Sequence, residues 1–157
     1  MAVEPAAVLV STEPVPGLER RLLLPLIGPT VGARTFQAAL AHARADDAII
    51  RVVRLAIVPR HLGLDALDEQ PAAVAPDLVA HIRRAGVRAE AWIQPGRTSR
   101  HALAQALDAY YGCIVLGAGG SRCDGFSAAD IAWLIPRAPG KIVVLAPSPG
   151  EPQLSEL

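Results

Sequence analysis

The sequence has little of what would tie it to a metal, a membrane or a nucleic acid. Two cysteines in 157 residues are too few for a disulfide framework, and no Cys/His cluster has the spacing of metal ligands. Lys+Arg and Asp+Glu balance at 15 each, so no overall field favours nucleic acid or an anionic surface. A basic leader and an apolar run of about 18 residues are also missing. We therefore expect a cytoplasmic protein with no metal, nucleic-acid or membrane partner.

The composition is that of one ordinary globular domain. Hydrophobic residues make up 52% of the chain, which is enough to bury a core without covalent cross-links. We expect this domain to span residues 20–148. Residues 1–19 contain three prolines and are expected to form a loose arm or an extra edge strand, and residues 149–157 form a tail.

Apolar, β-branched runs alternate along the chain with segments that have apolar residues at helical spacing. The runs predict strands at 22–27, 49–58, 87–93, 113–116 and 141–146. The intervening segments predict helices at 31–45, from Pro76 to Gly86, from Thr98 or Ser99 to Gly112, and from Ser127 onward. This alternation predicts an α/β fold with a doubly wound, five-stranded parallel sheet and helices on both faces.

The last predicted strand would leave a long apolar edge from Ile142 to Leu145. Unpaired backbone groups on such an edge tend to pair with another chain. We therefore expect a homodimer that forms through this edge.

Three predicted turns lie together at the carboxyl ends of the strands, where ligands collect in open α/β sheets. Ile27 and Gly28 follow the first strand, and Val58 follows the second. After the fourth strand comes a glycine loop, in which a phosphate could meet the backbone N–H groups of Gly117, Gly119, Gly120 and Ser121, with Ser127 opening the next helix. The alternative is an ordinary tight turn, because the loop has neither G-x-G-x-x-G spacing nor a Gly-Lys-Ser/Thr ending.

From Arg21 to Pro147 the chain resembles the universal stress protein family. The resemblance is carried by four stretches: Leu-Leu-Leu-Pro-Leu in the first strand, Gly-x-Thr-Ser-Arg-His-Ala-Leu from Gly96, Tyr-Gly-Cys-Ile-Val-Leu-Gly-Ala-Gly-Gly from Tyr111, and Arg137 to Val144 before and within the last strand. It implies a Rossmann-like fold, and ATP or AMP as ligand for those members that bind a nucleotide.

The chain departs from the nucleotide-binding members at two places. Those members have an aspartate at the end of the first strand, where this chain has Ile27, which cannot accept a hydrogen bond. Their phosphate pattern is Gly, two residues, Gly, nine residues, Gly-Ser/Thr; Gly117 and Gly120 fit its first half, but either Asp130-Ile131 or Ala128-Ala129 stands where it should close. The resemblance is therefore to a member with a degenerate ATP-binding motif.

Two functions remain open from the sequence. The first is a dimeric regulatory or stress-response module that is not an enzyme and that binds a protein partner or a small ligand. The second is an ATP- or AMP-binding protein that uses the glycine loop, with slow ATP hydrolysis not excluded. A metabolic enzyme would need a general base, and none is evident among His42, His61, His81 and His101 or in the acidic cluster at 65–69.

Overall fold

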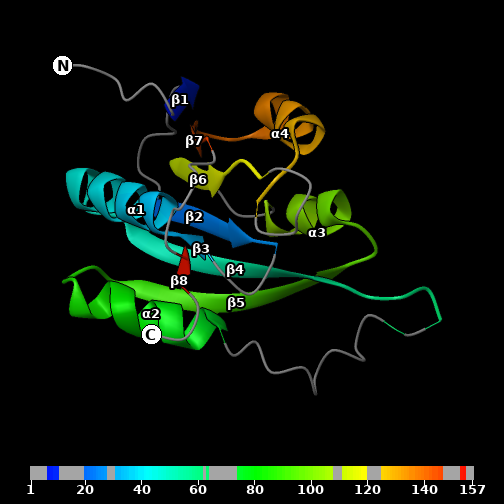
Figure 1. The fold of residues 1–157 in the computed structure, drawn as a ribbon, viewed down its shortest axis with the longest axis horizontal. Coiled ribbons are helices and arrows are strands. Elements are labelled where there is room, and N and C mark those ends of the chain that lie inside the picture. Colours follow the sequence, from blue (N-terminus) through cyan, green and yellow to red (C-terminus); the bar gives the residue numbers. More distant parts are fainter. Residues whose placement is uncertain are drawn as a thin grey trace.

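One mixed sheet forms the centre of the molecule. The computed structural model describes residues 7–10, 20–27, 31–61, 63, 74–107, 111–119, 125–146 and 153–154. Its main sheet has the strand order β1-β7-β6-β2-β4-β5 (Figure 1). Five of these strands are mutually parallel: β2 (Arg21–Leu26), β4 (Ile49–Ile57), β5 (Ala89–Gly96), β6 (Cys113–Gly117) and β7 (Lys141–Leu145). The predicted five-stranded parallel sheet is confirmed.

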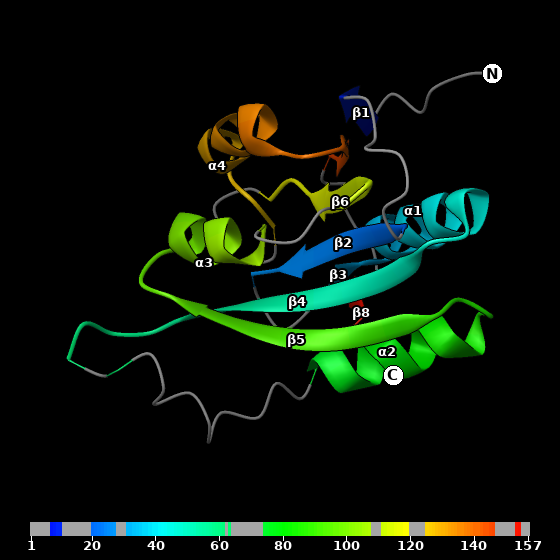
Figure 2. The same ribbon diagram turned by 180° about the vertical axis from the view of Figure 1, so that it is seen from behind.

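Helices cover both faces of the sheet, as Figures 1 and 2 show from opposite sides. One face packs against α1 (Ala33–Asp46) and α2 (Val74–Arg84), and the other against α3 (Ser99–Ala106) and α4 (Ala128–Leu134), which continues into the 3-10 turn η2 (Ile135–Arg137). The winding changes face between β2 and β6, so the sheet is doubly wound.

The position of β2 in the middle of the sheet explains why its sequence is apolar throughout. Leu22, Leu23 and Leu24 are all 0% exposed, because alternate side chains enter the two different cores on either face. A strand covered on both sides reads as an unbroken apolar run, as this one does.

Pro25 lies inside β2 without disrupting it. The carbonyl of Arg21 accepts from Gly112 on the β6 side, so by alternation Leu23 and Pro25 also direct their backbone groups toward β6. The β2–β6 ladder ends at the pair Leu23–Ile114, two residues before Pro25, whose missing N–H would be needed for the next bond. Pro25 thus coincides with the point where the two strands part.

The edge of β7 is not open, which corrects the expected dimer interface. The chain's own β1 (Ala7–Val10) pairs antiparallel with β7, from Ala7 opposite Leu145 to Val10 opposite Ile142. The extra edge strand, one of the two alternatives expected for residues 1–19, is therefore present, although nothing in its short apolar stretch indicated β7 as its partner. A second copy cannot pair along this edge while β1 occupies it.

Two smaller differences concern the ends of elements. The first helix begins at Ala33, because Val31–Gly32 form the short strand β3, which pairs with β8 (Gln153–Leu154). The third helix ends at Ala106 and does not reach Gly112. Its predicted length was wrong because Tyr111 belongs to the core between the sheet, α3 and α4, where it is 1% exposed.

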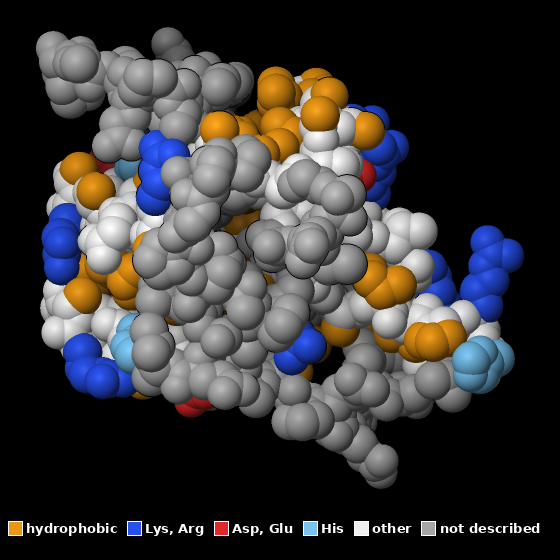
Figure 3. Space-filling model, in the orientation of Figure 1, with side chains coloured by type: hydrophobic (Ala, Val, Ile, Leu, Met, Phe, Trp, Pro, Cys, Tyr) orange, Lys and Arg blue, Asp and Glu red, His pale blue; other side chains and the backbone are white. Residues whose placement is uncertain are grey.

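The outer surface of α4 is notably apolar. In Figure 3, hydrophobic side chains gather over this helix at the top of the molecule. Ile131 and Trp133 are partly buried, and the guanidinium of Arg137 lies 4.5 Å from the centre of the Trp133 ring. None of the helices described here is long and apolar enough to cross a lipid bilayer.

Burial should make Cys113 inert. Its thiol is 2% exposed on the α1 side of β6, and burial raises its pKa to about 12, with nearby Lys141 opposing the shift. We expect a thiol reagent to leave Cys113 unmodified in the native protein at neutral pH and to label it once denaturant is added.

The raised pKa also fixes the sign of a stability effect. The thiol of the unfolded chain has an ordinary pKa of 9.0, so above this pH the unfolded state releases a proton that the folded state keeps. We expect wild-type stability to fall between pH 9 and about 12 by about 1 kcal/mol per pH unit more than that of Cys113→Ala, measured by chemical denaturation. Parallel pH profiles for the two proteins would contradict this.

Candidate functional site

The site lies where β2 and β6 separate. Ile27 and Gly117, two of the predicted ligand residues, line one pocket there together with Thr35 of α1 and Phe126. The pocket has a volume of about 20 Å³, which is room for a water molecule. Sites for drug-sized ligands are typically several hundred Å³, so this pocket does not accommodate a nucleoside as it stands.

The glycine loop begins with backbone groups that are already paired. The N–H of Ala118 donates to the carbonyl of Leu145 at 2.8 Å, and the N–H of Gly119 donates to the carbonyl of Phe126 at 2.9 Å. The N–H of Phe126 in turn donates to Gly117 at 2.9 Å. These amides bind the chain itself and are not directed at a ligand. The predicted ligand residues Gly28, Gly120 and Ser121 lie outside the described residues.

Close packing of the chain explains the described glycines without a ligand. A Cβ on Gly119 would lie 2.7 Å from the Cα of Gly125, because the two ends of the loop run against each other. A Cβ on Gly117 would lie 2.9 Å from Oγ1 of Thr35, the one buried polar residue among those described. The tight-turn alternative therefore accounts for both positions.

An ion pair joins the first turns of α3 and α4. Ser127 caps α4, as the sequence predicts, and its Oγ accepts a hydrogen bond of 3.1 Å from the N–H of Asp130. The carboxylate of Asp130 lies 2.7 Å from Nε of Arg100 at the start of α3. The start of α4 thus already has a negative side chain next to it, and that charge is neutralised by an arginine.

The end of β4 is closed by the turn that follows β5. Val58 is buried, and its N–H donates to the carbonyl of Gly96 at 2.9 Å. The guanidinium of Arg97 donates to the carbonyl of Pro59 at 2.7 Å, and the Arg97 N–H donates to Nδ1 of His101 at 3.0 Å. The structure therefore places Val58 in a different network from the pocket of Ile27 and Gly117.

Sequence reasoning missed Arg97 and Arg100. Both lie in the Gly-Arg-Thr-Ser-Arg-His stretch that opens α3 and that already carries part of the family resemblance. Thr98 caps this helix, its Oγ1 accepting from the N–H of His101 at 3.0 Å, which fixes the backbone from which both arginines project. The run of cations around a helix cap was the signal that could have pointed to them.

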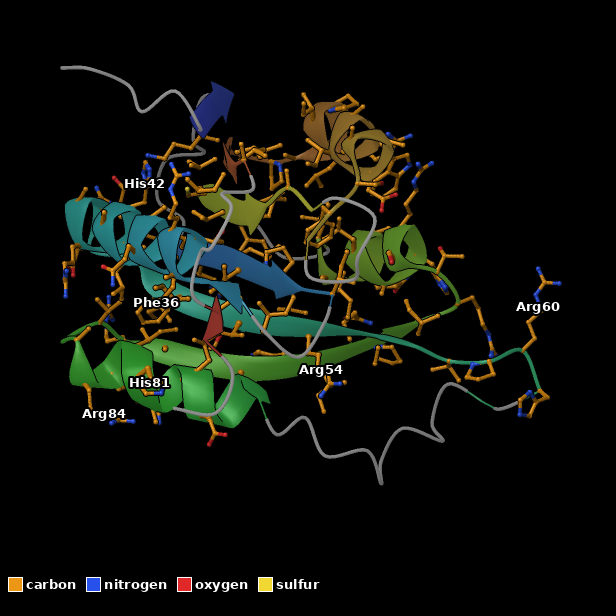
Figure 4. All side chains as sticks on the ribbon, viewed as in Figure 1. Phe36, His42, Arg54, Arg60, His81 and Arg84 are labelled. Atoms are coloured by element: carbon orange, nitrogen blue, oxygen red, sulfur yellow. The ribbon has the colours of Figure 1, made fainter. Side chains whose placement is uncertain are left out.

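The histidines do not assemble a catalytic group. His42 extends from α1 and His81 from α2, on separate helices (Figure 4). Burial lowers the pKa of His42, and the positive charge of Lys141 lowers it further. Among the described residues no three His, Cys, Asp or Glu side chains are grouped so that they could hold a metal ion. The acidic cluster at 65–69 and Cys123 lie outside these residues.

Comparison with known proteins identifies the fold. No protein-family model matches the sequence, and no curated protein matches it either. Among solved structures, a universal stress protein from Archaeoglobus fulgidus aligns with a TM-score of 0.61 at 14% identity, over 82% of this chain and 99% of that one. A second from Archaeoglobus fulgidus DSM 4304 gives 0.63 at 17% identity; it covers 91% of this chain, which spans only 50% of that protein.

A third structure is a universal stress protein in complex with cAMP, with a TM-score of 0.54 and 17% identity over 83% of this chain and 98% of that one. The class defined here is a doubly wound α/β domain in which the N–H groups of Val58, Ala118 and Gly119, at described strand ends, bond to the chain itself. Within that class, the fold is that of the universal stress proteins, as the resemblance in the sequence predicts.

The packing of Gly119 against Gly125 can be tested directly. We expect Gly119→Ala to destabilise the fold by about 1–3 kcal/mol, because the new methyl group has no space next to the Gly125 backbone. Gly112→Ala is the matched control, since its Cβ would meet its nearest neighbour, the Arg21 carbonyl oxygen, at 3.9 Å. Denaturant unfolding measures both, and equal stabilities of the two variants would contradict the packing role.

Proposed function

We propose that this chain is a universal stress protein-like regulatory module that works without binding ATP or AMP. One observation carries the proposal: three backbone N–H groups described at the carboxyl ends of the strands are already bonded to the chain itself. The N–H groups of Val58, Ala118 and Gly119 all donate to backbone carbonyls of this chain. A nucleotide would have to break such bonds before it could form its own.

The charges at the site also support the proposal. The Asp130 carboxylate stands at the start of α4, paired with Arg100 at 2.7 Å. A phosphate approaching that helix would meet this negative charge, and the arginine that could compensate is already engaged. Ile27 adds an apolar side chain where the sequence of a nucleotide-binding relative would have an aspartate.

A module of this kind acts by binding. The groups described at the strand ends that could act as a general base are already engaged: Asp130 pairs with Arg100, and Nδ1 of His101 accepts from the Arg97 N–H. We therefore propose that the protein is not an enzyme and that it acts in the cytoplasm through protein partners. We propose the apolar surface of α4, which includes the partly buried Trp133, as the surface that contacts another protein.

The alternative function is adenine-nucleotide binding. It is favoured by the fold likeness to the universal stress protein whose structure contains cAMP. In this alternative, ATP or AMP would bind through the loop that includes Gly120 and Ser121, and the paired amides would rearrange on binding.

Thermal unfolding with ATP, AMP or cAMP and magnesium separates the two functions. We expect no change in Tm, because the site is already occupied by groups of the chain. A ligand at about 100 times its Kd would instead stabilise the fold by roughly 2.7 kcal/mol, which is a shift of several degrees.

A saturable shift would contradict the proposal, provided that it arises at this site. Arg100→Ala tests that point, because Arg100 lies between α3 and α4 at the strand ends. Arg84→Ala is the matched control: Arg84 is an exposed arginine on α2 (Figure 4) whose Nε donates to the Ala80 carbonyl of its own helix. A shift that changes with Arg100→Ala alone would establish nucleotide binding here.

A further inference from the structure

The sheet has one edge that the described chain leaves unpaired. β1 covers β7 at one end of the strand order, and β5 stands at the other end with no described strand beside it. At the middle of β5 three successive residues are exposed: Ala91, Trp92 at 53% and Ile93 at 40%. Three consecutive exposed apolar residues on an edge strand are a liability unless a partner covers them.

The direction of the backbone groups on β5 can be read from its bonds to β4. The carbonyls of Arg88 and Gly96 accept from Ile50 and Val58 of the β4 chain. By alternation, Trp92 also directs its backbone groups toward β4, whereas Ala91 and Ile93 direct theirs outward. The two outward-facing residues are therefore the ones that can extend the sheet.

The same alternation places a distinctive feature at each end of this edge. The backbone groups of Ala89 are directed outward, away from β4. Its carbonyl already accepts from Nε and NH2 of Arg83 at 3.2 and 2.8 Å. Pro95 also faces outward and has no N–H to donate. One end of the edge thus lacks a free acceptor, and the other lacks a donor.

These features match when two copies of the edge are paired antiparallel about a two-fold axis at Trp92. Ala91 then lies opposite Ile93 of the second copy, and each pair exchanges two backbone hydrogen bonds. Ala89 lies opposite Pro95, so the N–H that proline lacks would have been directed at the carbonyl that Arg83 already satisfies. The Arg83 guanidinium occupies the outer side of the Ala89 carbonyl, and Nε2 of Gln94 donates to the Pro95 carbonyl at 3.3 Å, so the backbone bonds between copies are those of the Ala91 and Ile93 pairs.

We propose that β5 is the homodimer interface of this protein, with two β5 strands joined antiparallel at Trp92 into one continuous twelve-stranded sheet. The occupant is a second copy because the edge is complementary to itself in this register. This interface replaces the one expected at residues 142–145, which β1 fills. It stands independently of the proposed function, because it uses none of the strand-end groups.

Side chains at the centre support the same register. The Arg51 guanidinium lies 4.9 Å from the centre of the Trp92 ring, and its Nε lies 2.7 Å from Oε1 of Glu90. Arg51 also donates to the Tyr111 hydroxyl at 3.2 Å, so the cation that supports Trp92 is itself held in place. Trp92 is thereby oriented on the sheet face, where it would meet its symmetry mate, and an ordered Trp is a frequent anchor of interfaces.

Charge does not oppose this pairing. Glu90 is the one charged residue within β5, and Arg51 neutralises it. In the proposed register the two Glu90 positions are four residues apart along the strands, or roughly 14 Å. Each Glu90 lies opposite a neutral residue, Gln94 of the other copy.

Analytical ultracentrifugation of the full chain, over a wide dilution series, tests the dimer. We expect a dimer that dissociates on dilution, and we expect Ile93→Lys to shift the dissociation at least tenfold toward monomer. Ile57→Lys is the matched control, since Ile57 is a 48% exposed isoleucine at the end of the inner strand β4. Thermal unfolding of both variants verifies that each one folds.

Disulfide formation tests the register, in a Cys123→Ser background. Positions 90 and 94 of opposite copies face each other as a pair suited to a disulfide, so Glu90→Cys/Gln94→Cys should form covalent dimers on mild oxidation. Gln94→Cys alone should not, because its symmetry mate is roughly 14 Å distant along the strand. A wild-type monomer at all concentrations, a dimer unaffected by Ile93→Lys, or equal cross-linking of the single and double variants would each overturn the proposal.

Discussion

Each backbone N–H and carbonyl at the end of a buried strand must find a hydrogen-bond partner, and this requirement organises the molecule. In open α/β sheets the strand ends at the switch point often meet a ligand. Here the described chain meets its own needs: Ala118 and Gly119 donate to Leu145 and Phe126, and Val58 donates to Gly96. Three further features indicate that groups of the chain itself fill this site: the tight packing of Gly119 against Gly125, the small pocket and the Arg100–Asp130 pair.

The same requirement applies to the backbone groups at the two edges of the sheet, and they are satisfied in different ways. At β7 the chain supplies β1, which uses the outward backbone groups that a second copy would otherwise have taken. At β5, Arg83 satisfies one outward carbonyl, while Pro95 contributes no donor. What remains unpaired among the described residues is the short stretch around Trp92. Strand-end closure and edge pairing are therefore separate features, and a dimer does not depend on whether a nucleotide binds.

The sequence sufficed for the fold because its strongest patterns are local. The run from Leu22 to Leu26 and the Ser127 cap depend on neighbours in the chain, and both appear where they were predicted. The Pro25 position and the β1–β7 pairing depend on contacts between distant segments, which a periodic pattern does not encode. For the same reason the sequence could nominate Ile27, Val58 and the glycine loop, but not reveal that Val58 lies in the Arg97 network or that the loop amides are paired.

Amide hydrogen exchange at Ala118 and Gly119 tests the central claim, that the strand ends are satisfied by the chain itself. If their hydrogen bonds to Leu145 and Phe126 persist in solution, these amides exchange slowly, at rates similar to those in the body of β6, and an excess of ATP leaves the rates unchanged. Fast exchange in the free protein that becomes slow when ATP is added would contradict the account and would show that the loop amides are held open for a ligand.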